Sequence, residues 1–216
     1  MKASKNKLLM VKMLEILEYD ISLIKNWTRI LFYSIYKDYL LMKKLFLNES
    51  LFPFVLILLL AFARFIPHPP NFTPIVAVAI MSGYFFKNIN LSYIVLLISM
   101  LLVDVFIGFY KHMFFVYLSL FLITFIFFKI SDKVNSKNLF IFGFLGSLIF
   151  YLVSNFGVWA SGVLSPITNL PYEKNLNGLI NCYFLAIPFF TKTLISTIFF
   201  SYAAYLANYS LKKRFA

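Results

Sequence analysis

Basic residues in this chain fall on alternate sides of six apolar segments, and this division constrains the fold more than any other feature. Sixteen of the twenty Lys and Arg lie before the first segment, after the last, or in every second connection. The other connections hold only Lys111 and Lys174. Because cytoplasmic loops of membrane proteins retain Lys and Arg, the pattern predicts six spans with both termini in the cytoplasm. The sixteen are Lys2, Lys5, Lys7, Lys12, Lys25, Arg29, Lys37, Lys43, Lys44, Lys87, Lys129, Lys133, Lys137, Lys212, Lys213 and Arg214.

The composition supports a membrane protein. Hydrophobic residues make up 62% of the 216 residues, 28 residues are Phe, and 13% are charged. A soluble domain of this size could not bury so many apolar side chains in one core, so the lipid bilayer is the expected solvent. The net charge of +12 follows the topology and forms no single recognition surface. We therefore expect an anionic leaflet as its partner, and no nucleic acid.

The expected spans are residues 51–66, 72–86, 91–109, 113–128 and 139–164, followed by a long apolar stretch at 179–209. About 20 residues cross a bilayer as a helix, so the second span is short and the last stretch is too long. Pro188 and Lys192 interrupt that stretch, and both are costly inside a membrane helix. We therefore divide it into a half-helix at 179–190 and a sixth span at 194–209. The predicted fold is an all-α integral membrane protein, a six-helix bundle over residues 49–210 with a basic tail at 211–216.

Residues 1–48 form a separate region of basic, amphipathic character. Polar residues recur there at helical spacing between Leu, Ile and Met, at Lys12, Glu15, Glu18, Ser22, Lys25 and Arg29. We expect a cytoplasmic helix or pair of helices that lies on the inner leaflet with its lysines toward anionic lipid. The alternative is a docking surface for a cytoplasmic partner.

Two charged residues, Arg64 and Asp104, lie inside the expected spans near their outer ends. Four prolines between residues 67 and 74 follow Arg64 and make the first outer connection stiff and extended. Arg64 either snorkels to the outer headgroups or pairs with Asp104 or with an anionic ligand group. Asp104 is the only acid inside any expected span, and the similar depth of the two residues makes their pairing feasible.

The fifth segment carries Tyr151, Asn155 and Trp159 at intervals of four, which places them on one face of a helix. Such a face often serves only for packing between helices. It also suits a flat heterocycle that stacks on Trp159 while Asn155 binds its edge. Small residues are predicted at close helix contacts, namely Ala77, Ala79, Ser82, Gly83, Gly143, Gly146, Gly157 and Gly162.

Catalytic and metal-binding patterns are weak. His68 and His112 could join Asp104 in a metal site, but they lack ligand-type spacing, and a helix cap or a ligand hydrogen bond explains each more simply. Ser161 has no glycine two residues before it, as a nucleophile elbow requires. No glycine loop with Lys and Ser or Thr is present to hold a phosphate, so the chain does not hydrolyse ATP alone. We expect no enzyme activity, no cofactor and no metal.

Four blocks of sequence resemble a bacterial membrane family of uncharacterised transport proteins over roughly residues 51–207. They are Pro-His-Pro-Pro-Asn-Phe-Thr-Pro at 67–74, Leu-Val-Asp-Val-Phe-Ile-Gly at 102–108, Ser-Asn-Phe-Gly-Val-Trp-Ala-Ser-Gly at 154–162, and the segment 176–190. That family in turn resembles the substrate-binding S components of energy-coupling factor transporters, through six spans, an aspartate that closes the third, and a structured first outer loop.

The resemblance implies a bundle in a bacterial cytoplasmic membrane that captures a vitamin-like molecule from outside, with the first outer loop as a lid. A separate transmembrane coupling subunit and two ATPases would then reorient it. The chain departs from S components in two respects. Their first span often has small residues four apart, whereas Ala61 and Ala63 are two apart here, and residues 1–48 have no counterpart.

The predicted function is a membrane-embedded, substrate-binding subunit of a transporter, with its site in the outer half of the bundle. Excess positive charge there favours an anionic ligand. An alternative is a non-transporting anchor or assembly protein that acts through residues 1–48, and a third hypothesis is an intramembrane enzyme in which His68, His112 and Asp104 converge. The expected site residues are Arg64, His68 and Asn71 as clamp and lid, Asp104 orienting Arg64, and Asn155, Trp159 and Tyr183 lining the pocket.

Overall fold

The computed structural model describes residues 25–37, 40 and 51–215, and every secondary-structure element in those ranges is a helix. The all-α prediction is therefore confirmed. The chain divides into two compact units, Met1–Leu45 and Phe46–Ala216. In the first unit, residues 25–37 are helical. The rest of the predicted extension, apart from residue 40, lies outside the described residues.

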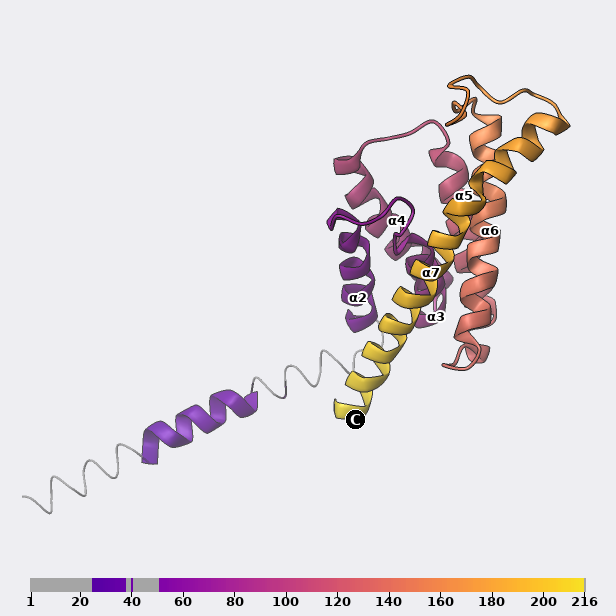
Figure 1. The fold of residues 1–216 in the computed structure, drawn as a ribbon. Coiled ribbons are helices and arrows are strands. Elements are labelled where there is room, and N and C mark those ends of the chain that lie inside the picture. Colours follow the sequence, from indigo (N-terminus) through magenta and orange to yellow (C-terminus); the bar gives the residue numbers. More distant parts are fainter. Residues whose placement is uncertain (1–24, 38–39, 41–50, 216) are drawn as a thin grey trace, which may run out of the picture. The chain divides into compact units, whose positions relative to one another are not determined.

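The second unit is a bundle of six α-helices among the described residues, with two short 3₁₀ turns (Figure 1). Each helix begins close to where the apolar pattern places it, because loop residues such as Pro, Asn and Gly separate the apolar runs. The elements are α2 (Leu51–Phe62), η1 (Ala63–Phe65), α3 (Ile75–Phe85), α4 (Ile89–Ile107), α5 (Met113–Lys129), η2 (Ser131–Lys133), α6 (Leu139–Ala160) and α7 (Leu176–Phe215).

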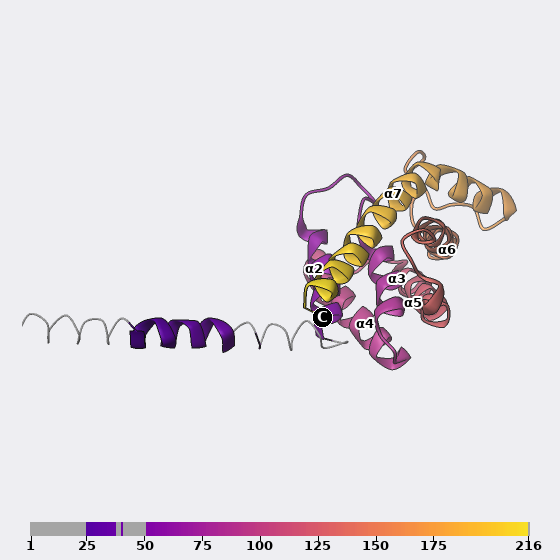
Figure 2. The ribbon, with the colours of Figure 1, turned by 90° about the horizontal axis from the view of Figure 1, so that it is seen from below.

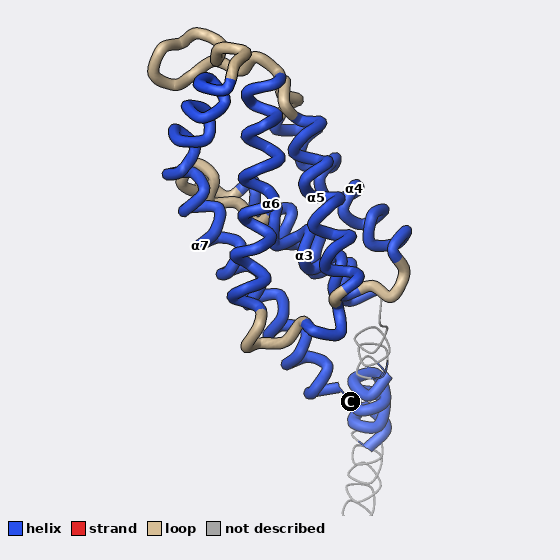
Figure 3. Tube along the Cα trace, turned by 90° about the vertical axis from the view of Figure 1, so that its right-hand side faces the viewer, coloured by secondary structure: helices blue, strands red, loops and turns tan. Residues whose placement is uncertain are grey.

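Loops join the helices at two opposite ends of this bundle (Figure 3). At one end, Lys87 and Asp132 line a shallow pocket together with Asn208 of α7, and the Tyr202 hydroxyl donates to the Ser136 carbonyl. This end also holds the connection from α5 to α6 and is here called the lysine end. The other end, called the cavity end, holds the loop at 161–175 at the top of Figure 1.

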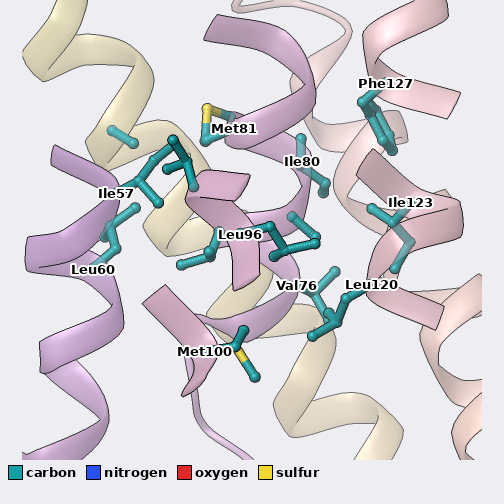
Figure 4. Close-up of a cluster of buried hydrophobic side chains, with 14 of the residues drawn as sticks. Ile57, Leu60, Val76, Ile80, Met81, Leu96, Met100, Leu120, Ile123 and Phe127 are labelled. Atoms are coloured by element: carbon teal, nitrogen blue, oxygen red, sulfur yellow. The ribbon is translucent and has the colours of Figure 1, made fainter. Parts of the chain in front are cut away.

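Helix α3 lies at the centre of the bundle and contacts all five of the other helices described there. Residues 76–83 are all buried, as expected for a helix that is apolar on every side. Val76, Val78, Ala79, Ile80 and Met81 belong to one hydrophobic cluster with side chains of α2, α4 and α5 (Figure 4). The helix has 11 residues, so it is about 16 Å long.

Glycines allow α6 and α3 to approach α5 closely. A Cβ at Gly83 would collide with the backbone of α5 at the Thr124 carbonyl, and one at Gly157 would collide with the Phe115 side chain. Thr124 also donates its hydroxyl to the Ala79 carbonyl of α3, at 3.0 Å. The close-packing prediction is thus confirmed for both glycines. It is wrong for Gly162, which has open space around it and turns the chain after α6 with a φ of +65°.

The predicted division of the last apolar stretch is wrong. The half-helix at 179–190 and the span at 194–209 are parts of one helix, α7, which has 40 residues and contains Pro188. It changes direction along its length (Figure 2). Proline removes one backbone hydrogen bond and kinks a helix, but packing can keep the helix continuous. Such packing is present here, because the Phe190 ring lies 5.1 Å from that of Tyr151 in α6.

Three helices of the described bundle, rather than six, are long and apolar enough to cross a membrane: α4, α6 and residues 176–211 of α7. This finding fits a membrane-embedded protein. The other helices, α2 with η1, α3 and α5, are apolar but shorter. The pair α2 with η1 and helix α3 flank the proline-rich connection. This connection takes up residues 66–74, which would otherwise have extended one of these helices.

Candidate ligand-binding site

A cavity of about 460 Å³ lies at the cavity end of the bundle. It exists because α3 has 11 residues whereas α6 has 22, so α3 does not fill the bundle over its whole length. The segment 66–74 accordingly lies part way along the bundle and not at its tip (Figures 1 and 3). The polar lining comes from several elements and includes Arg64, Asn71, Tyr110, His112, Asn155 and Thr193.

An ion pair lies behind one wall of this cavity. The Arg64 Nη2 atom is 2.7 Å from the Asp104 Oδ1 atom. The Asp104 side chain is completely buried and that of Arg64 is 10% exposed. Tyr117 donates its hydroxyl to the second carboxylate oxygen at 2.8 Å, and the Arg64 Nη1 atom lies 3.8 Å from the Met100 sulfur. The sequence-based prediction that Arg64 and Asp104 pair is confirmed.

Tyr110 and His112 follow α4 and line the cavity, and Tyr110 is close enough to the ion pair to interact with both of its charges. Burial raises the pKa of Tyr110 to about 12, and the Asp104 carboxylate adds to the rise while Arg64 opposes it. Burial lowers the pKa of His112, whose ring lies 4.8 Å from that of Tyr110. The Nδ1 atom of His112 is buried and has no hydrogen-bond partner among the described residues. Both side chains are therefore uncharged near neutral pH.

Two of the three aligned residues of α6 reach the cavity, Tyr151 and Asn155. Tyr151 donates its hydroxyl to the Tyr183 carbonyl at 2.6 Å, which holds α7 against α6. Asn155 donates its side-chain Nδ2 to the Tyr151 carbonyl at 2.8 Å. The amide oxygen of Asn155 is then the atom left to accept a hydrogen bond from a ligand.

Trp159, the third residue of that row, does not line the cavity. Its indole N–H donates to the Glu173 carbonyl at 2.8 Å, and the Lys174 ammonium lies 5.0 Å from the centre of its ring. The same ammonium donates to the carbonyls of Trp159 and Ala160 at the end of α6. The predicted stacking role does not fit this arrangement. The Lys174 ammonium already lies over the Trp159 ring, and the indole N–H holds the 161–175 loop through the Glu173 carbonyl.

Two further predicted residues also lie apart from the cavity lining. The Tyr183 hydroxyl donates to the Leu152 carbonyl at 2.7 Å, so this side chain packs along α6. The Nδ1 atom of His68 lies 3.0 Å from the carbonyl of Pro69 within its own segment. The described residues contain no group of three or more His, Cys, Asp or Glu able to hold a metal ion. His68, His112 and Asp104 accordingly form no such group in the described bundle.

Helix α7 holds the segment that was expected to act as a lid. Thr193 donates its hydroxyl to the Asn71 carbonyl at 3.4 Å, and Ser196 donates to the Thr73 carbonyl at 3.0 Å. Asn71 adopts a φ of 64°, which Asn tolerates better than most residues. Sequence reasoning missed these contacts, although the hydroxyls of Thr193 and Ser196, three residues apart in an apolar helix, were a usable signal.

Sequence reasoning also missed Tyr117 and Tyr110. Tyr117 is the second partner of the Asp104 carboxylate, and Tyr110 lines the cavity beside it. Aromatic residues are so frequent in this chain, at 20%, that a single Tyr carries little information. His112 had been considered as a metal ligand, a helix cap or the partner of a ligand hydrogen bond, but it was not among the expected site residues.

These features define an all-helical protein of membrane type with a cavity of small-molecule size at one end. The chain belongs to a family of unknown function, DUF6580, whose model matches residues 44–216. The match thus spans the whole described bundle. No curated protein and no solved structure matches the chain.

Proposed function

We propose that this chain is a membrane-embedded subunit that binds a small organic molecule in its cavity as the first step of transport. The observation that carries the proposal is the cavity itself, whose 460 Å³ lies within the range of about 300–1,000 Å³ that is usual for ligand pockets. Its lining combines aromatic walls with a few polar groups, which is the ordinary composition of such sites. The buried ion pair keeps Arg64 fixed at its edge.

The proposal includes six crossings of a bacterial cytoplasmic membrane. Helix α5 and the pair α2 with η1 are slightly short, but thinning of the bilayer and snorkelling of flanking residues accommodate such a mismatch. The short α3 is surrounded by protein, where irregular backbone at membrane depth is tolerated. The basic residues of the lysine end favour the cytoplasmic side for that end. The cavity then faces outward.

Coupling to energy belongs to other chains in this proposal. The sequence contains no phosphate-binding loop of the P-loop type, so ATP-driven transport through this chain would use separate ATPases. The resemblance to S components supports a transmembrane coupling subunit as the further partner.

The test is to purify the chain from its source cells in mild detergent and to weigh it intact by native mass spectrometry. We expect one small molecule per chain in the wild type. Ala186→Phe places a large side chain in the cavity and should abolish this occupancy. Ile187→Phe, at an exposed position next to it on α7, is the matched control and should keep it. A wild-type chain without any bound molecule would contradict the proposal.

One observation favours the second candidate function, an anchor or assembly protein. The helix at residues 25–37 exposes Trp27, Leu31 and Ile35 along one side, at intervals of four, while Lys25 and Arg29 lie at another part of its circumference. Such a helix can lie on a membrane or bind another chain. Deletion of residues 1–44 separates the two functions. The anchor hypothesis requires loss of function with an occupied cavity, whereas the binding proposal requires retained uptake.

A further inference from the structure

The formal charges around the cavity cancel. Arg64 is the only residue that carries a formal charge near neutral pH among the described residues that line it. Its guanidinium is already paired with Asp104 at 2.7 Å. Sequence reasoning had counted Arg64 as surplus positive charge. Because the carboxylate is completely buried directly behind it, the pair presents no net charge to a molecule in the cavity.

No other Lys, Arg, Asp or Glu of the described bundle lines the cavity, and Lys192 of α7 is not part of the lining either. Lys174 is engaged with Trp159 and with the carbonyls at the end of α6, next to Glu173. Lys111 is exposed and does not line the cavity. His112 does line it, but burial lowers its pKa and favours the neutral ring.

Binding of a charged ligand in this cavity would therefore be electrostatically unfavourable. A carboxylate could use Arg64 fully only by displacing Asp104, which is also held by the Tyr117 hydroxyl. That exchange would leave a buried carboxylate without its cation, which is strongly unfavourable. A cationic ligand would meet the guanidinium without any free acid beside it. A molecule without net charge avoids both penalties.

Arg64 and His112 at the cavity have hydrogen-bonding groups that no described residue uses. A guanidinium has five N–H groups, and among the described residues those of Arg64 contact only Asp104 and the weakly accepting sulfur of Met100. The buried Nδ1 atom of His112 has no partner in the described part of the chain. Buried polar atoms in proteins are nearly always satisfied by protein or by ordered water, and His112 lines the cavity, so its ring is available to a molecule bound there.

We infer that the cavity selects a polar organic molecule with no net charge, which accepts a hydrogen bond from Arg64 and forms another with His112. Asp104 is a positioning residue in this scheme, because it sets the charge and orientation of Arg64 without touching the molecule. Aromatic walls from Phe150, Phe189 and Phe190 suit a flat ring system as its apolar part. This inference rests on the proposed binding function and narrows its class of ligand.

The experiment uses the whole chain, emptied by extensive washing in detergent and then incubated with a methanol–water extract of the source cells. Native mass spectrometry identifies the retained masses, and their ionisable groups give the net charge at pH 7. We expect the wild type to retain an uncharged molecule. His112→Phe should weaken its retention about tenfold, as expected for the loss of one good hydrogen bond. His112→Gln should restore part of this loss.

Asp104→Asn tests the charge argument directly. It leaves the Arg64 cation without compensation, so this variant should newly retain anions from the same extract. If it cannot be purified as a monodisperse protein, Arg64→Gln combined with Asp104→Asn takes its place. That pair removes both charges together, and it should show no gain in retained anions.

The outcomes distinguish failure of this inference from failure of the proposed binding function. A wild-type chain that retains a molecule with net charge overturns this inference but leaves the proposed binding function intact. Equal retention by wild type and His112→Phe removes His112 from the site. A wild-type chain that retains no more than Ala186→Phe contradicts the proposed function, and the inference falls with it.

Discussion

The Asp104 carboxylate joins three elements, because one oxygen lies 2.7 Å from the Arg64 guanidinium and the other accepts the Tyr117 hydroxyl at 2.8 Å. Arg64 belongs to η1, Asp104 to the last turn of α4, and Tyr117 to the second turn of α5. A buried carboxylate with both oxygens engaged fixes the relative positions of these elements at the cavity end.

Breaking this ion pair from one side should be far worse than removing it altogether. Asp104→Leu leaves the Arg64 cation nearly buried and unpaired, so we expect the free energy of unfolding to fall by about 3–5 kcal/mol. Arg64→Met combined with Asp104→Leu should recover much of that loss. Thermal unfolding in detergent, followed by circular dichroism, measures both. If the loss of stability in the double variant equals the sum of the losses in Arg64→Met and Asp104→Leu measured separately, the two residues are not coupled.

Gly83 is expected to be the least replaceable small residue of the core. A methyl group there meets the rigid backbone of α5, so Gly83→Ala should cost about 1–3 kcal/mol of stability or prevent folding. Gly143→Ala is the matched control, because its Cβ comes closest to a side-chain carbon of Ile198, at 3.0 Å, and the Ile198 backbone lies at ordinary contact distance, 3.7 Å or more. Comparison of the two midpoints of thermal unfolding checks this. Equal tolerance at both positions would contradict the observed approach of α3 to α5.

Weakening the contact between Trp159 and Lys174 should change the dynamics of the 161–175 loop and leave ligand binding unchanged. Trp159→Phe removes the hydrogen bond to Glu173 and weakens the cation–π contact, each worth about 1 kcal/mol. We expect faster hydrogen exchange in residues 161–175 with unchanged occupancy of the cavity by native mass spectrometry. Loss of the bound molecule from this variant would instead support the stacking role that the sequence had suggested.

His112 should make the protein less stable in mild acid. Burial lowers its pKa in the folded state below the ordinary value of 6.5, so the unfolded chain binds the proton first as the pH falls. The stability contributed by the neutral ring is complete above pH 6.5 and is lost as the pH drops through the folded-state pKa. The unfolding midpoint measured from pH 7.5 to 5 should fall less in His112→Gln. Identical slopes in wild type and variant would exclude His112 as the cause.

The sequence was sufficient for the all-helical fold class and for one central contact. Apolar runs separated by Pro, Asn and basic residues predicted the start of every helix in the bundle within a few residues, and the error in the last stretch was the division at Pro188. The pair of Arg64 and Asp104 could be predicted because a buried charge needs a partner and the expected spans offered a single acid. These inferences depend on charge and hydropathy, which one sequence displays directly.

The sequence could not predict which residues of other elements contact a given side chain. Trp159 looked available for stacking because nothing in its own helix occupies the ring, but Lys174, fifteen residues later, does. Pro188 looked like a break because its cost is local, whereas the packing that holds α7 together comes from α6. The cavity likewise follows from the difference in length between α3 and α6. Such features depend on helix packing, which no local pattern records.

The most direct test of the central claim is cysteine labelling in intact source cells, with Cys182, the single and buried cysteine of the chain, replaced by Ala. Leu164→Cys in this background places a thiol at an exposed position that lines the cavity, so a maleimide that cannot cross membranes should reach it from outside. Ser136→Cys in the same background is the control, because this exposed position lies at the lysine end. We expect Leu164→Cys to react in intact cells, and the control variant to remain unlabelled until the membrane is opened. Labelling of the Ser136→Cys chain alone in intact cells would contradict a cavity that opens to the outside.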